Sequence, residues 1–249
     1  MRADLVRLKV RRTGYLGLIA GSWVCYVTTL LLFGWMVEGV FTGSLGHFDL
    51  ETRTFIHHLT SPTLTATMRL LSTIGSTAFL AELFVLFFVG FLQVRWREDA
   101  AWLALTMAGA AVIVLTLKYS FQRARPVPFF GTAPPSYSFP SGHAVASFLF
   151  FAQLAVVFTD RIRSRLARLL IWSATTMLIA GIGFSRIYLG VHYTTDVIAG
   201  YAVAAAWCNT LAIAHRSPSA GRIVGTLVAA LDKFHVAAAD ENTLPGMKR

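Results

Sequence analysis

Charged residues are scarce in this chain of 249 residues. They make up 14% of the sequence, whereas soluble domains carry roughly 25%. Hydrophobic residues make up 55%, and the mean hydropathy is +0.61. This balance excludes an ordinary soluble domain.

Acidic residues are scarcer than basic ones, and the formal net charge is +10. Such a charge could indicate nucleic-acid binding. However, the Lys and Arg residues lie in short clusters between long apolar runs, which is the pattern of loops that flank membrane helices. We therefore expect an integral membrane protein with no nucleic-acid partner.

Cysteine is also scarce. The chain has two, Cys25 and Cys208, each inside an apolar run and neither near a second residue at metal-ligand spacing. This excludes a disulfide scaffold and a cysteine metal site. We expect both to be small buried hydrophobic residues.

Six apolar runs are long enough, with their flanks, to approach the roughly 20 residues that span a bilayer. They cover residues 15–37, 74–94, 100–117, 144–158, 169–184 and 197–214. Only helices satisfy their own backbone in lipid, so an all-α bundle of six transmembrane helices is predicted. Residues 1–214 would form one domain, and 215–249 a cytoplasmic tail with a partly interfacial helix.

The basic residues predict the orientation. With six crossings, 16 of the 22 Lys and Arg residues fall on the side that holds both termini. The positive-inside bias then makes both termini cytoplasmic. The six remaining cations lie on the outer side: Arg53, Arg69, Lys118, Arg123, Arg125 and Arg186.

Three polar motifs stand where apolar runs end on that outer side. The first contains Lys118 and Arg125-Pro126, the second is Pro140-Ser141-Gly142-His143, and the third holds Ser185-Arg186, His192 and Asp196. Taken singly, each has a plain alternative: Lys118 and Arg125 as interfacial cations, Ser141 as a helix cap, and His192 with Asp196 as a structural pair four residues apart.

Taken together, the motifs supply three fixed cations, two imidazoles and one carboxylate. Such a set suits binding a phosphate, attacking it with one imidazole and protonating the leaving group with the other. No metal site is predicted, because the carboxylate would be committed to His192 and Mg²⁺ usually needs one or two of its own.

The three motifs, in this order and spacing, resemble the signature of the type-2 phosphatidate phosphatase and vanadium haloperoxidase superfamily. The resemblance implies His192 as the nucleophile, Asp196 as the group that orients it and His143 as the general acid and base. It also implies a phosphate site formed by Lys118, Arg125, Ser141, Gly142 and Arg186, with no metal and no cofactor.

Three functions of different class remain open at this stage: a lipid phosphate phosphatase, a phosphotransferase using the same phosphohistidine, and a non-enzymatic membrane protein. Intact His143, His192 and Asp196 argue against the last. Haloperoxidase chemistry is disfavoured because those relatives are soluble. We expect a membrane lipid as the substrate and no obligate protein partner.

Within the phosphatase class we predict undecaprenyl diphosphate as the substrate, at the periplasmic face of a bacterial inner membrane. The alternatives are phosphatidylglycerophosphate and phosphatidate. Two further segments carry weaker predictions. Residues 55–71, which include His57 and His58, are expected to form an interfacial helix, and Phe129, Phe130, Tyr137 and Phe139 an interfacial aromatic belt.

Overall fold

The computed structural model describes residues 2–132, 134–215, 222 and 224–230. Its eight numbered helices are α1 (Arg2–Thr42), α2 (Gly46–His58), α3 (Pro62–Ile74), α4 (Thr77–Gln93), α5 (Arg97–Phe121), α6 (Gly142–Thr159), α7 (Arg165–Tyr188) and α8 (Thr194–His215). No strand occurs among the described residues. The predicted all-α fold is confirmed.

Five of these helices are long and apolar enough to cross a membrane by themselves. They are α5, α6, α7, α8 and the Trp23–Thr42 part of α1. The sixth candidate is a bent pair, because α3 and α4 meet the criterion only together and are bent by 50° at their break. The predicted second span, 74–94, thus corresponds to α4, which has 17 residues and needs α3 to complete the crossing.

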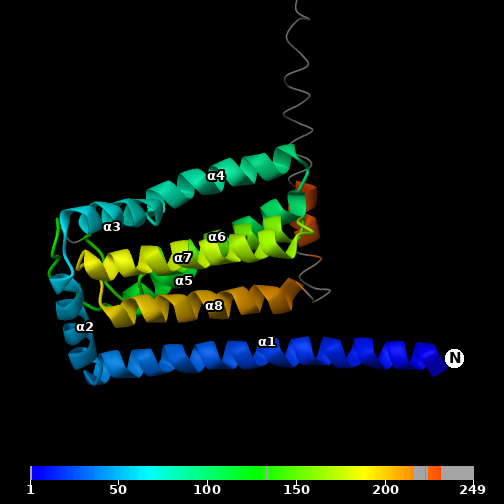
Figure 1. Cartoon of the computed structure of the whole chain (residues 1–249), viewed down its shortest axis with the longest axis horizontal. Helices are drawn as coiled ribbons and strands as arrows, with labels where there is room; N and C mark the ends of the chain where they lie inside the picture. The colour runs from blue at the N-terminus through cyan, green and yellow to red at the C-terminus, as the bar shows by residue number, and fades with distance from the viewer. Residues whose placement is uncertain (1, 133, 216–221, 223, 231–249) are drawn as a thin grey trace, which may run out of the picture.

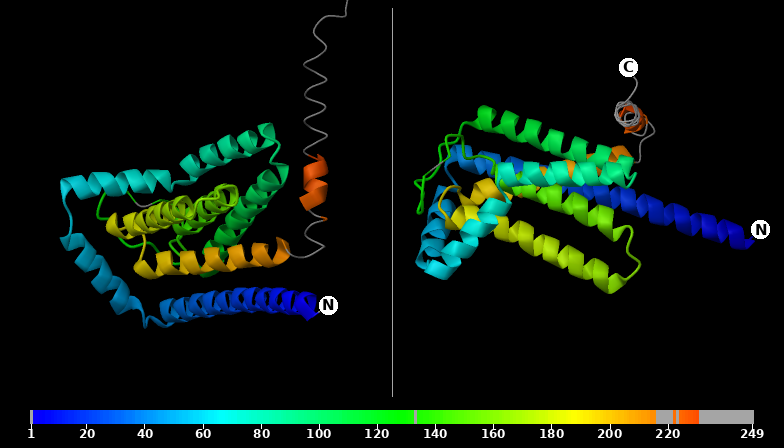
Figure 2. Two further views of the ribbon diagram at one scale, coloured as in Figure 1. Left: turned by 45° about the vertical axis from the view of Figure 1, so that its right-hand side comes forward. Right: turned by 90° about the horizontal axis from the view of Figure 1, so that it is seen from above.

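The spanning helices run side by side along the long axis, and α2 lies across one end of the bundle, between the end of α1 and the start of α3 (Figures 1 and 2). The central helix is α6, which contacts α4, α5, α7 and α8. Large apolar side chains on the outer helices are exposed, among them Leu31, Val112 and Met177. So much exposed apolar surface suits contact with lipid.

The predicted interfacial helix over 55–71 is in fact two helices. Pro62 at the first turn of α3 has no N–H and cannot continue α2, and Ser61 caps the new helix by accepting from the Leu64 N–H at 3.3 Å. Residues 55–58 therefore belong to α2, while 62–71 begin the bent pair that crosses the membrane.

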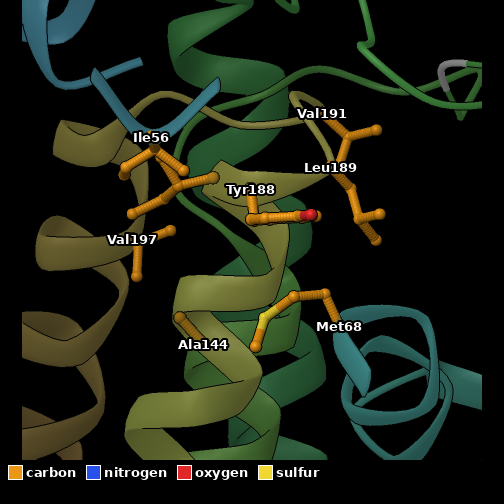
Figure 3. Close-up of a cluster of buried hydrophobic side chains, with 8 residues drawn as sticks. Ile56, Met68, Ala144, Tyr188, Leu189, Val191 and Val197 are labelled. Carbon is orange, nitrogen blue, oxygen red and sulfur yellow. The ribbon is translucent and has the colours of Figure 1, made fainter. Parts of the chain in front are cut away.

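A cluster of buried apolar side chains ties α2 and α3 to the rest of the bundle (Figure 3). Ile56 of α2 and Met68 of α3 pack with Tyr188 of α7 and Val197 of α8, and Ala144 of α6 completes the group. The cluster lies at the end of the bundle where the three polar motifs occur. It therefore fixes α2 relative to those motifs.

Two side-chain predictions are wrong. Cys25 is exposed on α1 rather than buried, while Cys208 is half-buried. Phe139 does not belong to an interfacial belt, because it is fully buried against Phe33 of α1 and Phe121 of α5.

The prediction of a tail from 215 to 249 falls largely outside the described residues. Within it, the described residues 224–230 are helical. The cytoplasmic location of the tail stays a prediction.

Candidate active site

The three motifs meet at one end of the bundle because alternate helices begin and end there. Lys118 is in the last turn of α5 and Arg186 in the last turn of α7. Ser141 is the N-cap of α6, followed at once by Gly142 and His143, and Asp196 lies in the first turn of α8. All eight predicted site residues therefore lie at the end of the bundle that α2 crosses (Figure 1).

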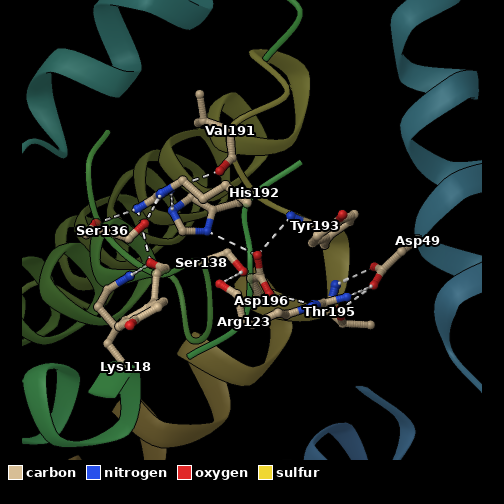
Figure 4. A network of polar contacts seen from close by, with 12 residues as sticks. Asp49, Lys118, Arg123, Ser136, Ser138, Val191, His192, Tyr193, Thr195 and Asp196 are labelled. Carbon is tan, nitrogen blue, oxygen red and sulfur yellow. Dashed lines mark hydrogen bonds and ion pairs between the residues drawn. The ribbon is translucent and has the colours of Figure 1, made fainter. Parts of the chain in front are cut away.

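His192 and Asp196 form the centre of a polar network (Figure 4). His192 Nδ1 lies 3.2 Å from Asp196 Oδ2, and both side chains are buried. The same oxygen accepts the backbone N–H of Tyr193 at 2.9 Å. His192 precedes α8 rather than lying on it, so the turn at Gly190, with φ of +74°, and not helical periodicity alone brings the two side chains together.

Arg125 defines the tautomer of His192. Its Nη1 lies 2.9 Å from His192 Nε2 and also donates to the Val191 carbonyl oxygen at 2.8 Å. A guanidinium has only donors, so Nε2 must carry the lone pair and Nδ1 the proton that faces Asp196. Arg125 is itself held by Ser136, whose carbonyl oxygen accepts from Nε at 2.7 Å.

Burial keeps His192 neutral. It lowers the pKa of the imidazole to about 4, although Asp196 acts in the opposite direction, and the nearby Arg125 and Arg186 lower it further. Burial also lowers the pKa of Arg125. A neutral imidazole with an unprotonated Nε2 has the form that a nucleophile needs.

Two polar groups of the motifs are buried without a protein partner among the described residues. They are the Ser141 hydroxyl and Nε of Arg186. Nη1 of Arg186 donates to the Ser72 hydroxyl of α3 and anchors the guanidinium there. Its Nε is the atom that remains without a protein partner. Buried polar groups without partners are unfavourable, and an anion that accepts from both would satisfy them.

The start of α6 adds to this anion site. Its first backbone N–H groups have no partner within the helix, and they carry the positive end of the helix dipole. The Ser141 N–H itself is used elsewhere, because it donates to the Asp196 carbonyl oxygen at 2.9 Å. This bond fixes the start of α6 to the first turn of α8. An added Cβ on Gly200 of α8 would lie 3.0 Å from the Ser141 carbonyl oxygen, so glycine permits this close contact.

The remaining two motif side chains lie at the edges of this arrangement. Nζ of Lys118 donates to the Tyr137 carbonyl oxygen in the loop between the first two motifs. His143 lies against the break between α3 and α4, because an added Cβ on Gly75 would be 3.4 Å from its Cδ2.

Two residues that the sequence interpretation gave no role are part of the network. Nη1 of Arg123 lies 2.6 Å from Asp196 Oδ1, and Nη2 lies 2.8 Å from Oδ2 of Asp49, a buried residue of α2. Burial lowers the pKa of Arg123, but the two carboxylates outweigh that effect and raise it. Arg123 was recognisable only as one of the outer cations, and nothing in the sequence singled out Asp49.

The loop before Gly131 is held on α2. The guanidinium of Arg53 lies 4.1 Å from the ring centre of Phe129, and its Nη1 donates to the Gly190 carbonyl oxygen at 3.1 Å. His57 stacks on the same ring at 4.0 Å. Both the loop and the turn before His192 are therefore attached to α2.

A surface hollow of about 480 Å³ lies at the start of α3, lined by Thr60, Ser61, Thr65, Arg69 and Phe130, with Pro62 and Ala66. None of the motif residues lines it. Because its lining lacks the histidines, we place the candidate site at the buried network instead. Across the described part of the chain, no three His, Cys, Asp or Glu side chains are grouped as metal ligands.

Comparison with known proteins shows a match to one family. Residues 99–218, which contain all three motifs, match the PAP2 superfamily. The chain is therefore similar to this superfamily over the segment that carries its candidate site. The resemblance on which the predicted site rests is thereby confirmed at the level of the family.

The chain is similar to several phosphatases of this kind. It is 24% identical over 182 residues to phosphatidylglycerophosphatase B of Bacillus subtilis, covering 71% of this chain and 88% of that protein. It is 35% identical over 130 residues to lipid A 1-phosphatase of Rhizobium johnstonii, covering 48% of each. With undecaprenyl-diphosphatase of Sulfolobus acidocaldarius the identity is 30% over 131 residues, covering 48% of this chain and 56% of that one.

The fold has a solved counterpart. The crystal structure of a transmembrane PAP2-type phosphatidylglycerolphosphate phosphatase from Bacillus subtilis superimposes with a TM-score of 0.70 at 22% identity, covering 78% of this chain and 98% of the other.

The chain spans about half the length of the Rhizobium and Sulfolobus relatives. It is an integral membrane phosphatase, a phosphoric ester hydrolase.

Proposed function

We propose that this membrane phosphatase releases the terminal phosphate of undecaprenyl diphosphate through a phosphohistidine at His192. The observation that carries the proposal is a neutral, buried His192 whose unprotonated Nε2 faces Arg125. Nearby, the Ser141 hydroxyl and Arg186 Nε are buried and lack a protein partner. An anion such as phosphate is the ligand that satisfies these groups together.

In the first step, His192 Nε2 attacks phosphorus and the bond from phosphorus to the leaving oxygen breaks. Arg125 moves its hydrogen bond from Nε2 to a phosphate oxygen, which frees the lone pair. His143 gives a proton to the leaving oxygen, and Asp196 stabilises the imidazolium through the Nδ1 proton. The products of this step are phosphohistidine and the lipid monophosphate.

In the second step, the now basic His143 takes a proton from water, and the resulting hydroxyl attacks phosphorus. The bond between phosphorus and His192 Nε2 breaks, inorganic phosphate leaves and the imidazole is regenerated. Lys118, Arg125 and Arg186 neutralise the non-bridging oxygens in both steps, while the Ser141 hydroxyl and the Gly142 N–H complete the phosphate site. This scheme uses no cofactor.

A lipid substrate fits the position of the site. The motif residues lie at the ends of membrane-spanning helices, so a phosphate on a membrane lipid can reach them while the lipid stays in its leaflet. With 16 of 22 cations on the side of the termini, we place the site at the periplasmic face of a bacterial inner membrane and both termini in the cytoplasm. The Sulfolobus relative is named for undecaprenyl diphosphate.

Phosphatidylglycerophosphate is the second candidate, because the Bacillus relative named for it is matched over 88% of its length. Phosphatidate and the 1-phosphate of lipid A complete the comparison. Purified protein in liposomes should be offered each lipid, and kcat/KM compared. A tenfold preference, about 1.4 kcal/mol in transition-state stabilisation, for any of the other lipids would overturn the choice of undecaprenyl diphosphate.

The same assay separates hydrolysis from phosphotransfer. We expect free phosphate in an amount equal to the lipid consumed. Phosphate appearing instead on a second lipid or an added sugar would identify a phosphotransferase that uses the same histidine.

A further inference from the structure

Asp49 and Arg123 extend the His192–Asp196 pair into a chain of four buried or half-buried ionisable groups that reaches α2. We propose that these two residues position the nucleophile: Asp49 balances the charge of Arg123, so that Asp196 remains available to stabilise His192. The proposal rests on the proposed phosphohistidine function. Asp49 lies outside the segment that matches the superfamily.

Arg123 bridges two carboxylates with separate nitrogens (Figure 4). Its Nη1 reaches Asp196 at 2.6 Å, and its Nη2 reaches Asp49 at 2.8 Å. The ring of Tyr193 covers the guanidinium at 4.1 Å. Because one nitrogen serves each carboxylate, the planar fork of arginine is needed, and lysine cannot replace it.

Asp49 is buried and is hydrogen-bonded to α8 and to Arg123. It is 1% exposed, and its carboxylate accepts from the Thr195 N–H at 2.9 Å and from the Thr195 hydroxyl at 2.7 Å, besides Arg123. A carboxylate from α2 thus accepts hydrogen bonds in the first turn of α8, where a negative charge is favourable. No other acid of α2 is buried.

The charges alternate along this chain. Asp49 is negative, Arg123 positive and Asp196 negative, and His192 becomes positive when Nε2 bonds to phosphorus. Without Asp49, the whole charge of Arg123 would act on Asp196 and oppose the positive charge on His192. Without Arg123, Asp196 would favour that charge more strongly, but nothing would hold its second oxygen. The two residues therefore act on His192 in opposite directions.

The test compares Asp49→Asn and Arg123→Gln with the matched control Glu51→Gln. Glu51 is a carboxylate on the same helix, but its side chain is 68% exposed and pairs with His47. Each variant is purified in detergent, checked for folding by thermal unfolding, and its kcat and the acid limb of kcat/KM are measured. Substrate ionisation is the same for all variants, so a difference between two acid limbs reflects a changed pKa in the enzyme.

We expect Asp49→Asn to lower kcat about 10- to 100-fold, as removal of outer-shell partners of metal-bound histidines does. Its acid limb should move to lower pH, and that of Arg123→Gln to higher pH. The double variant should lie between them. Glu51→Gln should match the wild type. Groups that also act on His192 are unchanged in these variants: Arg125, His143, Arg186 and Asp196.

Arg123→Lys covers the case in which Asp49→Asn does not fold. It keeps the charge and loses the fork, so kcat should fall while the acid limb stays in place. The decisive comparison is between Asp49→Asn and Arg123→Gln. If their acid limbs do not move, or move in the same direction, the role of the two residues is merely structural and the proposal is overturned. If the wild-type protein releases no phosphate from any lipid, the proposed function fails instead.

Discussion

At the scale of single residues, the orientation of one imidazole organises the site. Asp196 lies against Nδ1 of His192, and Arg125 faces Nε2. Attack and protonation are assigned to different histidines, so the two can be separated experimentally.

His192→Ala should abolish turnover with every substrate, because no other group supplies the attacking nitrogen. His143→Ala should lose about 10²- to 10⁴-fold with lipid leaving groups, which need a proton. With a nitrophenyl phosphate, which leaves without protonation, His143→Ala should still form phosphohistidine, detectable by acid-labile ³²P. Turnover that survives in His192→Ala would remove this residue as the nucleophile.

The acid limb of kcat/KM should lie near pH 4 rather than near 6.5, because burial lowers the pKa of His192 to about 4. Protonation below that value removes the lone pair, so activity is present above it and is lost as the pH falls through it. The free energy of unfolding also decreases as the pH falls from 6.5 to about 4, because in this range the unfolded chain binds a proton at His192 that the folded chain does not bind. Two substrates with different phosphate pKa values separate the enzyme from the substrate, and a limb at or above 6.5 in both would contradict a neutral His192.

Activity should survive excess chelator and should be inhibited by vanadate, which resembles the five-coordinate transition state. The reason is the charge of the site, where arginine and lysine take the place that Mg²⁺ has in many phosphoryl-transfer sites. Phosphate release with and without EDTA measures this. Loss on chelation that Mg²⁺ restores would show that a metal takes part.

At the scale of helices, the site depends on how closely α8 approaches the start of α6. Glycine at position 200 makes this approach possible, since an added Cβ would lie 3.0 Å from both the Ser141 carbonyl oxygen and the Ala144 Cβ. The Ser141–Asp196 backbone bond lies at the same contact.

Gly200→Ala should therefore lower both the thermal midpoint and kcat, because overpacking of this kind costs about 1–3 kcal/mol. The matched control is Gly90→Ala in α4, where an added Cβ meets nothing within 4 Å. That variant should be neutral or slightly stabilised, since alanine favours helix over glycine. Equal midpoints and equal kcat in the two variants would show that the contact between α8 and α6 tolerates the extra methyl group.

At the scale of the whole molecule, the positive-inside distribution predicts which face of the membrane the site occupies. Single cysteines test this prediction, after Cys25 and Cys208 are replaced. Val127 is 81% exposed at the site end and is a suitable probe, whereas Val191 is only 5% exposed and is unsuitable. Ser164 lies in the exposed turn before α7, at the opposite end.

Val127→Cys should react with an impermeant thiol reagent in intact cells, and Ser164→Cys only after the cells are opened. The positive-inside distribution of 16 against 6 cations is the reason. Labelling of Ser164→Cys alone in intact cells would invert the topology and move the site to the cytoplasmic face.

The sequence by itself determined the class of this protein. Long apolar runs can only be helices in lipid, and parity along six of them brings Lys118, His143, Arg186 and Asp196 to one end. These are local signals, readable from neighbouring residues. The motif spacing further indicated the superfamily, which the match over residues 99–218 confirms.

The tertiary structure alone decided what holds the site in place. Asp49 and Arg123 are separated by 74 residues, and neither hydropathy nor spacing links them; they meet because α2 lies across the end of the bundle. The sequence pattern predicts Phe139 as an interfacial aromatic residue, but its side chain is buried. The same pattern predicts one helix over residues 55–71, but the helix is divided before Pro62. Such features depend on packing between distant elements, which no local pattern records.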